Sequence, residues 1–260
     1  MRILFVADVF GAPGRRAVET RLPSLRKELG ADFCIVNGEN AAAGRGITAK
    51  LADRLLAAGA DVVTLGNWVW GQPGFAPYLT GTDRVLRPAN LSPQTPGTGL
   101  AVHDDVAVIN LLGVFSLDPF ESPFIAVDRL VDEARASTPV VVVDFHAEAT
   151  SEKVALARYL DGRVTAVVGT HTHVQTNDAR VLAGGTAAIT DAGMTGPHDS
   201  VIGSEEHGAL KRFLTGMPTR LEPATGDVRI EGVVVDCDER GRATACELLR
   251  IQVDETASAS

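Results

Sequence analysis

Short, mostly apolar runs recur along this chain, and each is followed within a few residues by a polar side chain. Four of them occupy residues 3–6, 33–36, 61–65 and 164–168. Runs of this length and composition are typical of strands that are covered on both faces, as in parallel sheets. Amphipathic segments with helix-capping residues separate the first three runs. The order of strand, loop and helix therefore predicts an α/β fold.

The predicted helices begin and end at residues with capping preferences. Pro13 suits a first helical turn, and Gly30 suits the end of that helix. Thr48 is expected to cap a second helix that stops near Gly59. The pair at 122–123, Ser-Pro, is expected to begin another helix. These signals place helices between the predicted strands.

The pattern changes in the middle of the chain. Residues 100–102 and 106–110 flank the turn 103–105, His-Asp-Asp, and predict a hairpin. We expect a second sheet here, mixed or antiparallel, because a hairpin departs from the parallel order of the first part. The run 140–143 predicts a strongly buried strand that ends at His146. Further strands are expected at 187–191, 228–235 and 243–251, with a loop over 192–198.

Three of the predicted strands deliver a polar side chain at their carboxyl ends. Asp8, Glu39 and Asn67 each follow such a strand, and Asn40 stands next to Glu39. In α/β sheets, ligands collect at the carboxyl ends of strands. Any one of these could be an ordinary turn residue, because Asp and Asn are favoured in turns. Three in succession indicate a shared site instead.

Two histidines with one residue between them, His171 and His173, follow the run 164–168 and Gly169. The glycine is expected to end the strand, and in extended backbone residues two apart point the same way. Two imidazoles on one side of a strand end can offer two nitrogen ligands to a metal. The alternative is one core histidine and one surface histidine. His146 supplies a third imidazole.

Composition narrows the class of protein. The 260 residues are 45% hydrophobic, so we expect a single domain over 1–260 with a frayed tail at 256–260. A net charge of −9 argues against a protein that coats duplex nucleic acid, although a bound metal can reverse the local field for a small phosphate ester. Three cysteines without a C-x-x-C pattern predict reduced thiols. With no signal-peptide pattern and no run of membrane length, we expect a cytoplasmic protein without a membrane partner.

The candidate ligands mix carboxylate, carboxamide and imidazole groups. This set suits manganese, iron or zinc better than calcium or magnesium. It holds more ligands than one ion needs, and Glu39 could bridge two ions. Two ions about 3.5–4 Å apart make hydroxide available near neutral pH and bind phosphoryl oxygens, as displacement at phosphorus requires. The seven residues, called the ligand cluster below, are Asp8, Glu39, Asn40, Asn67, His146, His171 and His173.

Several sequence strings resemble the calcineurin-like metallophosphoesterases. They are Asp8, the triplet Gly38-Glu39-Asn40, the pair Gly66-Asn67, His146, and Gly-Thr-His-Thr-His at 169–173. Longer strings at 37–42, 86–90, 143–150 and 190–197 are similar to those of the bacterial 2',3'-cyclic-nucleotide 2'-phosphodiesterase family within that superfamily. The resemblance covers nearly the whole chain.

The resemblance implies a four-layer α/β/β/α metallophosphoesterase sandwich with two mixed sheets, and a pair of divalent ions, usually assigned as iron and also supported by manganese. It implies that Asp8, Glu39, Asn40 and His173 hold one ion, and that Glu39, Asn67, His146 and His171 hold the other. It also implies a homo-oligomer that acts on cyclic nucleotides. We expect hydrolysis of 2',3'-cyclic nucleotides or similar phosphodiesters by metal-activated hydroxide, and RNA ends could be a further substrate. Asp144 or Glu148 could orient a ligand imidazole.

One position departs from the family pattern. The family has Gly-Asn-His, in which the histidine protonates the leaving oxygen, whereas this chain has Trp68 there. An indole N–H donates a hydrogen bond but is no acid near neutral pH, and general acid catalysis commonly contributes about 10²–10⁴-fold. His198 could take the role, or the strained cyclic ester could need little acid help. The catalytic acid is therefore left unassigned.

Nearby side chains suggest how a substrate would be bound. Trp68, and Trp70 with it, could stack on a nucleobase or pack on the strand below. Arg45 and Arg87 could contact phosphate or lie on the surface. Three functions therefore compete: a phosphodiesterase with two metal ions, a broader phosphatase with the same centre, and a metal- or nucleotide-binding regulatory protein with weakened catalysis.

Overall fold

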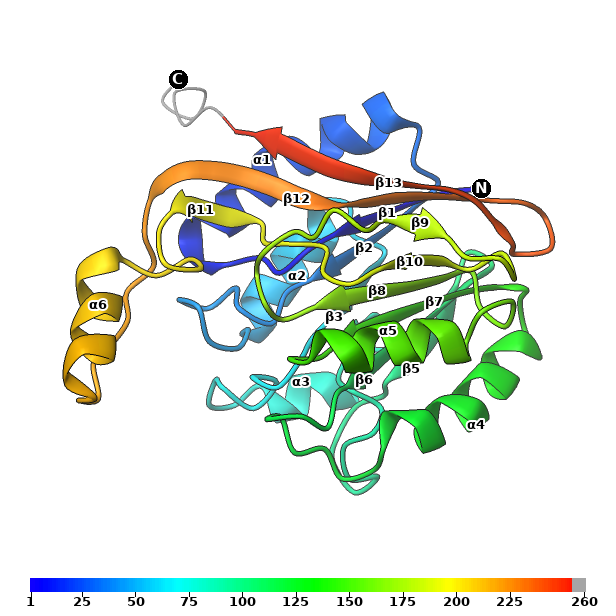
Figure 1. Ribbon diagram of the computed structural model, residues 1–260, viewed down its shortest axis with the longest axis horizontal. Helices are drawn as coiled ribbons and strands as arrows, with labels where there is room; N and C mark the ends of the chain where they lie inside the picture. The colour runs from blue at the N-terminus through cyan, green and yellow to red at the C-terminus, as the bar shows by residue number, and fades with distance from the viewer. Residues whose placement is uncertain (254–260) are drawn as a thin grey trace.

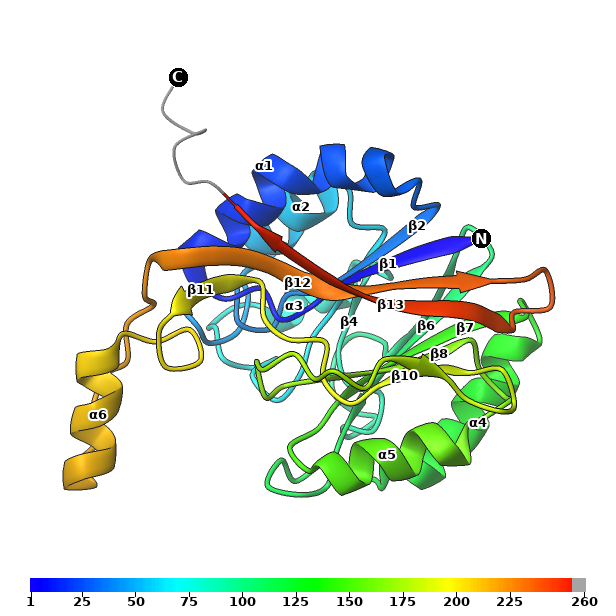
Figure 2. The ribbon, with the colours of Figure 1, turned by 45° about the horizontal axis from the view of Figure 1, so that its top comes forward.

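Two β-sheets lie face to face in the computed structural model, which describes residues 1–253, and helices cover the outer face of each sheet (Figure 1, Figure 2). The layers follow the order α/β/β/α, which confirms the fold expected from the sequence. The tail predicted at 256–260 lies outside the described residues.

The first sheet has seven strands. Four of them are parallel: β1 (Arg2–Val6), β2 (Phe33–Asn37), β3 (Val62–Thr64) and β4 (Val85–Leu86). The other three are β11 (Gly196–Asp199), β12 (Gly226–Cys237) and β13 (Ala243–Gln252). β12 runs antiparallel to β1 and pairs with both β11 and β13. The order is β11-β12-β1-β2-β3-β4, and β12 and β13, which pair with each other, cover the strands predicted at 228–235 and 243–251.

The second sheet has six strands in the order β5-β6-β7-β8-β10-β9. They are β5 (Leu100–His103), β6 (Val106–Leu112), β7 (Val140–His146), β8 (Ala166–Thr170), β9 (Arg180–Val181) and β10 (Ala187–Ile189). The four central strands are parallel, and both edge strands are antiparallel to their neighbours. This is the mixed second sheet that the hairpin at 100–110 predicts.

The helices lie largely where the capping residues place them. They are α1 (Gly11–Leu29), α2 (Ala49–Ala57), α3 (Ala76–Thr80), α4 (Pro123–Arg135), α5 (Thr150–Tyr159) and α6 (Glu206–Thr215). Gly30 ends α1 with a left-handed backbone (φ 63°), as helix ends favour. The Thr48 hydroxyl accepts a hydrogen bond from the backbone N–H of Leu51, so it caps α2.

Two predictions about strand ends are wrong. The segment 192–198, predicted as a loop, contains the start of β11, because backbone pairing with β12 decides its conformation. Gly169, predicted to end a strand, lies inside β8. A Cβ at this position would lie 1.8 Å from the carbonyl oxygen of Thr190, so glycine is required by the close approach of a neighbouring segment.

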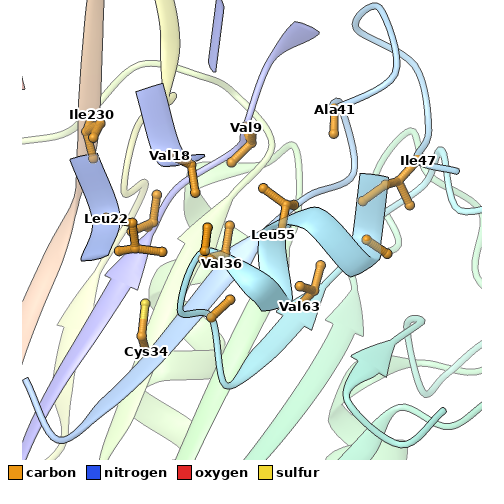
Figure 3. Packing of buried hydrophobic residues seen from close by; sticks show 14 of the residues in the cluster. Val9, Val18, Leu22, Cys34, Val36, Ala41, Ile47, Leu55, Val63 and Ile230 are labelled. Atoms are coloured by element: carbon orange, nitrogen blue, oxygen red, sulfur yellow. The ribbon is translucent and has the colours of Figure 1, made fainter. Parts of the chain in front are cut away.

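Three apolar layers hold the sheets and helices together. The layer between the first sheet and helices α1 and α2 is drawn in Figure 3. Along β1, Leu4 and Val6 belong to this layer, whereas Ile3 and Phe5 belong to the layer between the two sheets. A third layer packs α4 and α5 on the second sheet. Burial on both faces explains the continuous apolar runs of the sequence.

Helix α6 projects from the layered body (Figure 2). It exposes Phe213 and Leu214, which are 79% and 82% accessible. Within residues 1–253, no helix combines the length and the apolar composition that crossing a bilayer requires.

Candidate metal centre

The predicted ligands that carry a side-chain oxygen come from turns that follow strands of the first sheet. Asp8 follows β1, Glu39 and Asn40 follow β2, and Asn67 follows β3. The carboxylates of Asp8 and Glu39 are almost completely buried. Val9 and Ala41, adjacent in sequence to two of these ligands, pack into the layer between this sheet and its helices (Figure 3). Core packing therefore fixes the backbone of two of these turns.

The three imidazoles come from the second sheet. His146 is the last residue of β7, and His171 directly follows β8. The backbone is left-handed at His171 (φ 100°) and at His173 (φ 64°). The prediction that extended backbone carries both rings on one side is therefore wrong. A tight turn, rather than the alternation of a strand, brings them to the ligand cluster.

The two sheets meet at Nε2 of His146. This nitrogen lies 3.0 Å from Glu39 Oε1, 3.0 Å from Asn67 Oδ1 and 3.0 Å from His171 Nδ1. One N–H can donate to only one of these atoms at a time. Ligand atoms bonded to one cation at about 2.1 Å, in neighbouring octahedral positions, lie about 3 Å apart. The spacing therefore fits a cation among the four atoms, and Glu39, His146 and His171 form a compact potential metal site.

A hydrogen-bonded chain fixes the tautomer of His146. Its Nδ1 lies 2.9 Å from the Thr170 hydroxyl, which in turn donates to Asp144 Oδ1 at 2.7 Å. Because that hydroxyl proton goes to Asp144, Nδ1 must be a donor, and Nε2 is the nitrogen that carries the second proton or, without it, offers its lone pair to a cation. Asp144 also accepts from the Asn37 amide at 2.9 Å and from the Thr64 hydroxyl, both on the first sheet. The same carboxylate thus orients the ring and joins the sheets beneath the cluster.

The other two imidazoles are oriented in the same way. His171 Nε2 lies 2.8 Å from Glu148 Oε2, and His173 Nδ1 lies 3.0 Å from the carbonyl oxygen of Ile202. Each acceptor draws the ring proton outward, so the inner nitrogens are left with lone pairs. The orienting roles considered for Asp144 and Glu148 match these contacts. Sequence reasoning assigned no role to Thr170, although it belongs to the string 169–173, and missed Ile202, whose carbonyl leaves no side-chain signal.

Asp8 carries an oxygen that the described chain leaves without a partner. Its Oδ2 accepts from the His171 backbone N–H at 2.8 Å and lies 3.7 Å from His173 Nε2. Its Oδ1 is buried and has no hydrogen-bond partner within residues 1–253. The Asn40 amide lies 3.0 Å from His173 Nε2. An orphaned buried carboxylate oxygen is costly, so a second cation beside Asp8 fits this side of the cluster.

The ionisation of the cluster follows from burial and from its carboxylates. Burial lowers the pKa of His146, but Glu39, Asp8 and Asp144 outweigh it and raise this pKa to about 9. Burial, with the charge of His146, lowers the pKa of His171 to about 3. Burial raises the pKa of Glu39, yet the charge of His146 and its hydrogen bond outweigh this and lower it. Burial raises the pKa of Asp8 well above its usual range. The ionised Glu39 therefore requires a positive charge beside it, which a proton or a metal ion can supply.

The turn after β3 passes directly beside the cluster. A Cβ at Gly66 would lie 2.2 Å from Glu39 Oε2 and 2.4 Å from His146 Nε2, so glycine is needed there. The Trp68 backbone N–H donates to Glu39 Oε2 at 3.2 Å. The Arg45 guanidinium stacks on the Trp68 indole, with its carbon 4.1 Å from the ring centre. Trp68 and Arg45 thus form one unit at the edge of the cluster.

The structure brings all seven predicted ligands together but places His198 elsewhere. His198 is on β11, where its Nε2 lies 3.1 Å from the Met194 carbonyl oxygen and 3.9 Å from Glu231 Oε2. Among residues 1–253 it makes no hydrogen bond or ion pair with the cluster. Trp70 is exposed, and Arg87 is buried, where it donates to backbone carbonyls including that of Pro88.

Known proteins resemble this chain over nearly its whole length. A family model described as YmdB-like protein matches residues 4–249. The 2',3'-cyclic-nucleotide 2'-phosphodiesterase of Bacillus subtilis (strain 168) is 46% identical over 98% of each chain. The solved structure of a hypothetical protein from Thermus thermophilus has a TM-score of 0.92 and 42% identity, covering 98% of this chain and 100% of that one.

A novel phosphatase from Mycoplasma pneumoniae has a TM-score of 0.91 and 32% identity, covering 98% of this chain and 95% of that one. The fold is therefore the metallophosphoesterase sandwich that the sequence predicts.

Proposed function

The chain belongs to the family of YmdB-like proteins, and on that premise we propose that it is a metal-dependent phosphodiesterase of 2',3'-cyclic nucleotides or similar phosphodiesters. Hydrolysis of a phosphoester is common to a relative named as a phosphodiesterase and one named as a phosphatase. The observation that carries the proposal is the convergence of a carboxylate, an amide oxygen and a second imidazole on His146 Nε2.

The ligand cluster would hold two divalent cations. Asp8, Glu39, Asn40 and His173 would hold one, and Glu39, Asn67, His146 and His171 would hold the other. The inward lone pairs of the imidazoles and the orphaned oxygen of Asp8 support this assignment. Mixed imidazole and carboxylate ligands favour iron or manganese, as in the family that the sequence resembles.

Two such cations would supply a nucleophilic water at neutral pH and offset the charge of the phosphoryl oxygens. The chain itself holds the ligands in place, since Thr170 and Asp144 keep the His146 ring in one orientation. Arg45 is exposed beside the cluster and can receive the phosphate of the substrate.

The leaving 2'-oxygen would receive a hydrogen bond but no acidic proton from this chain. Trp68 stands where the family has its acid histidine, and its indole can donate only a hydrogen bond. The oxygen then takes its proton from water. The ring strain of a five-membered cyclic ester lowers the need for an acid, which is why a cyclic diester is the substrate class that suits this chain best.

A comparison of three substrates tests the proposal. Purified protein with Mn²⁺ is assayed on 2',3'-cyclic AMP, on bis-p-nitrophenyl phosphate and on p-nitrophenyl phosphate. We expect the cyclic nucleotide to be cleaved fastest and the monoester slowest. Preference for the monoester would favour a phosphatase, as one relative is named. Binding of Mn²⁺ without hydrolysis of any of the three would favour a regulatory binding protein.

A further inference from the structure

The segment 191–195 passes from the second sheet to the first, between β10 and β11. It belongs to the string 190–197 that the sequence resemblance singles out, and the proposed mechanism gives it no role. Asp191, at its start, is 1% exposed, and its Oδ1 accepts from the Gly193 N–H at 2.9 Å. A carboxylate buried this deeply needs partners that keep it charged.

The second oxygen of Asp191 holds the residue between the two histidines. Its Oδ2 accepts from the Thr172 backbone N–H at 3.0 Å and from the Thr172 hydroxyl at 2.7 Å. The flanking residues His171 and His173 both have left-handed backbone, which is unfavourable for side chains other than glycine. Such a turn persists only where surrounding groups hold it, and Asp191 supplies two of the bonds that do so.

Lys153 completes the arrangement from the helix side. It is on α5, is 3% exposed, and its Nζ lies 2.7 Å from the same Oδ2 of Asp191. The ammonium group neutralises the buried carboxylate and fixes its position.

The other end of the segment reaches the oxygen ligands. The Thr195 N–H donates to the Asp8 carbonyl oxygen at 3.0 Å, and its own carbonyl oxygen accepts from the Phe10 N–H at 2.9 Å. Met194, the residue before Thr195, donates its N–H to Glu231 Oε2 at 3.2 Å. One short segment therefore contacts the turn that carries Asp8 and the turn that carries two imidazoles.

We propose that Asp191, paired with Lys153, is a positioning residue for the metal centre. Asp191 holds the turn 171–173 so that the rings of His171 and His173 face the predicted oxygen ligands of the first sheet. Thr195 holds the turn that carries Asp8 in place opposite them. The proposal rests on the proposed function, because it assumes that the ligand cluster binds metal. Its chemistry predicts that the hydrogen-bond acceptor at 191, rather than the charge of the ion pair, sets the affinity for metal.

Two double variants separate these roles. K153M/D191L replaces the ion pair by apolar groups of similar size, which buried pairs often tolerate, and removes the acceptor for Thr172. K153M/D191N also removes the charges but keeps an acceptor oxygen. Each full-length protein is stripped with a chelator and titrated with Mn²⁺, free Mn²⁺ is measured by electron paramagnetic resonance, and thermal unfolding of the stripped protein is recorded.

We expect K153M/D191L to bind Mn²⁺ about 10–100-fold more weakly than the unsubstituted chain, as loss of a partner that orients metal ligands typically does. We expect K153M/D191N to bind close to the unsubstituted affinity. Equal affinity in K153M/D191L, or equal loss in both folded variants, would overturn the proposal. T172V, which removes only the hydroxyl donor, should weaken binding less, and unchanged affinity there would also count against it. Failure of the unsubstituted chain to bind Mn²⁺ would instead refute the proposed function.

Discussion

The two sheets bring different chemistry to the same cluster. The first sheet supplies carboxylates and amides, and the second supplies all three imidazoles. The backbone differs as well: within residues 1–253, none of the four predicted ligands on the first sheet has a positive φ, whereas His171 and His173 do. We call Asp8, Glu39, Asn40 and Asn67 the oxygen side of the cluster, and His146, His171 and His173 the nitrogen side. Ordinary turns after strands thus place the oxygen side, while the nitrogen side depends on hydrogen bonds from distant residues. The oxygen side should therefore set whether metal binds, and the outer partners of the imidazoles should set how tightly.

The largest effect should follow from Glu39→Gln, because Glu39 is the ligand proposed to touch both ions. We expect both Mn²⁺ ions to be lost and turnover of 2',3'-cyclic AMP to fall by more than about 100-fold, beyond what loss of an outer partner causes. Metal content by mass spectrometry and steady-state kinetics check this. Retention of two ions in Glu39→Gln would show that Glu39 is not a ligand shared by both ions.

Trp68→His would add an imidazole to the oxygen side, where none of the predicted ligands is a histidine. If a missing acid limits turnover, kcat should rise, by as much as about 10²-fold at the lower end of general acid catalysis. Trp68→Phe is the matched control, since it removes the indole N–H without adding an acid. No gain for the histidine variant over the phenylalanine variant would argue that the strained ester needs no acid.

Thr170→Val tests the dependence of the nitrogen side on its outer partners. It removes the acceptor of His146 Nδ1, so we expect Mn²⁺ affinity to fall about 10–100-fold while the fold persists. Glu148→Gln is the control, because Glu148 is 53% exposed at its side chain and solvent can replace it. A larger loss for the glutamine variant would reverse the expected ranking of the two partners.

The smallest effect should be on how the stability of the metal-free protein depends on pH. The pKa of His146 is raised from 6.5 to about 9, by the carboxylates of Glu39 and Asp8 on the first sheet and by Asp144. A raised pKa in the folded state stabilises the fold fully below pH 6.5, and this contribution is lost as the pH rises through about 9. Urea unfolding of the chelated protein should show that decline. His146→Gln should reduce it, and an unchanged decline would assign the effect to other groups.

Much of the fold could be predicted because its signals are local. Thr48 caps the start of α2 and Gly30 ends α1 as expected, and the hairpin at 100–110 correctly indicates a second sheet. The strand β11 could not be predicted, because β12, which follows it only after helix α6, decides its conformation. Gly169 was misleading for the same reason, since the backbone at Thr190, not a turn, requires a glycine there.

The sequence alone determined which ligand types follow which strands, because strand ends and turn residues are set by neighbours in the chain. Only the tertiary structure decided which atoms meet. The left-handed turn at His171, the chain from His146 through Thr170 to Asp144, and the hold of Asp191 on Thr172 all depend on contacts between separate elements. The physical reason is that the group which accepts the hydrogen bond from one nitrogen of an imidazole fixes the ring orientation, and with it the direction of the lone pair on the other nitrogen. That acceptor is chosen by packing rather than by neighbours in the chain.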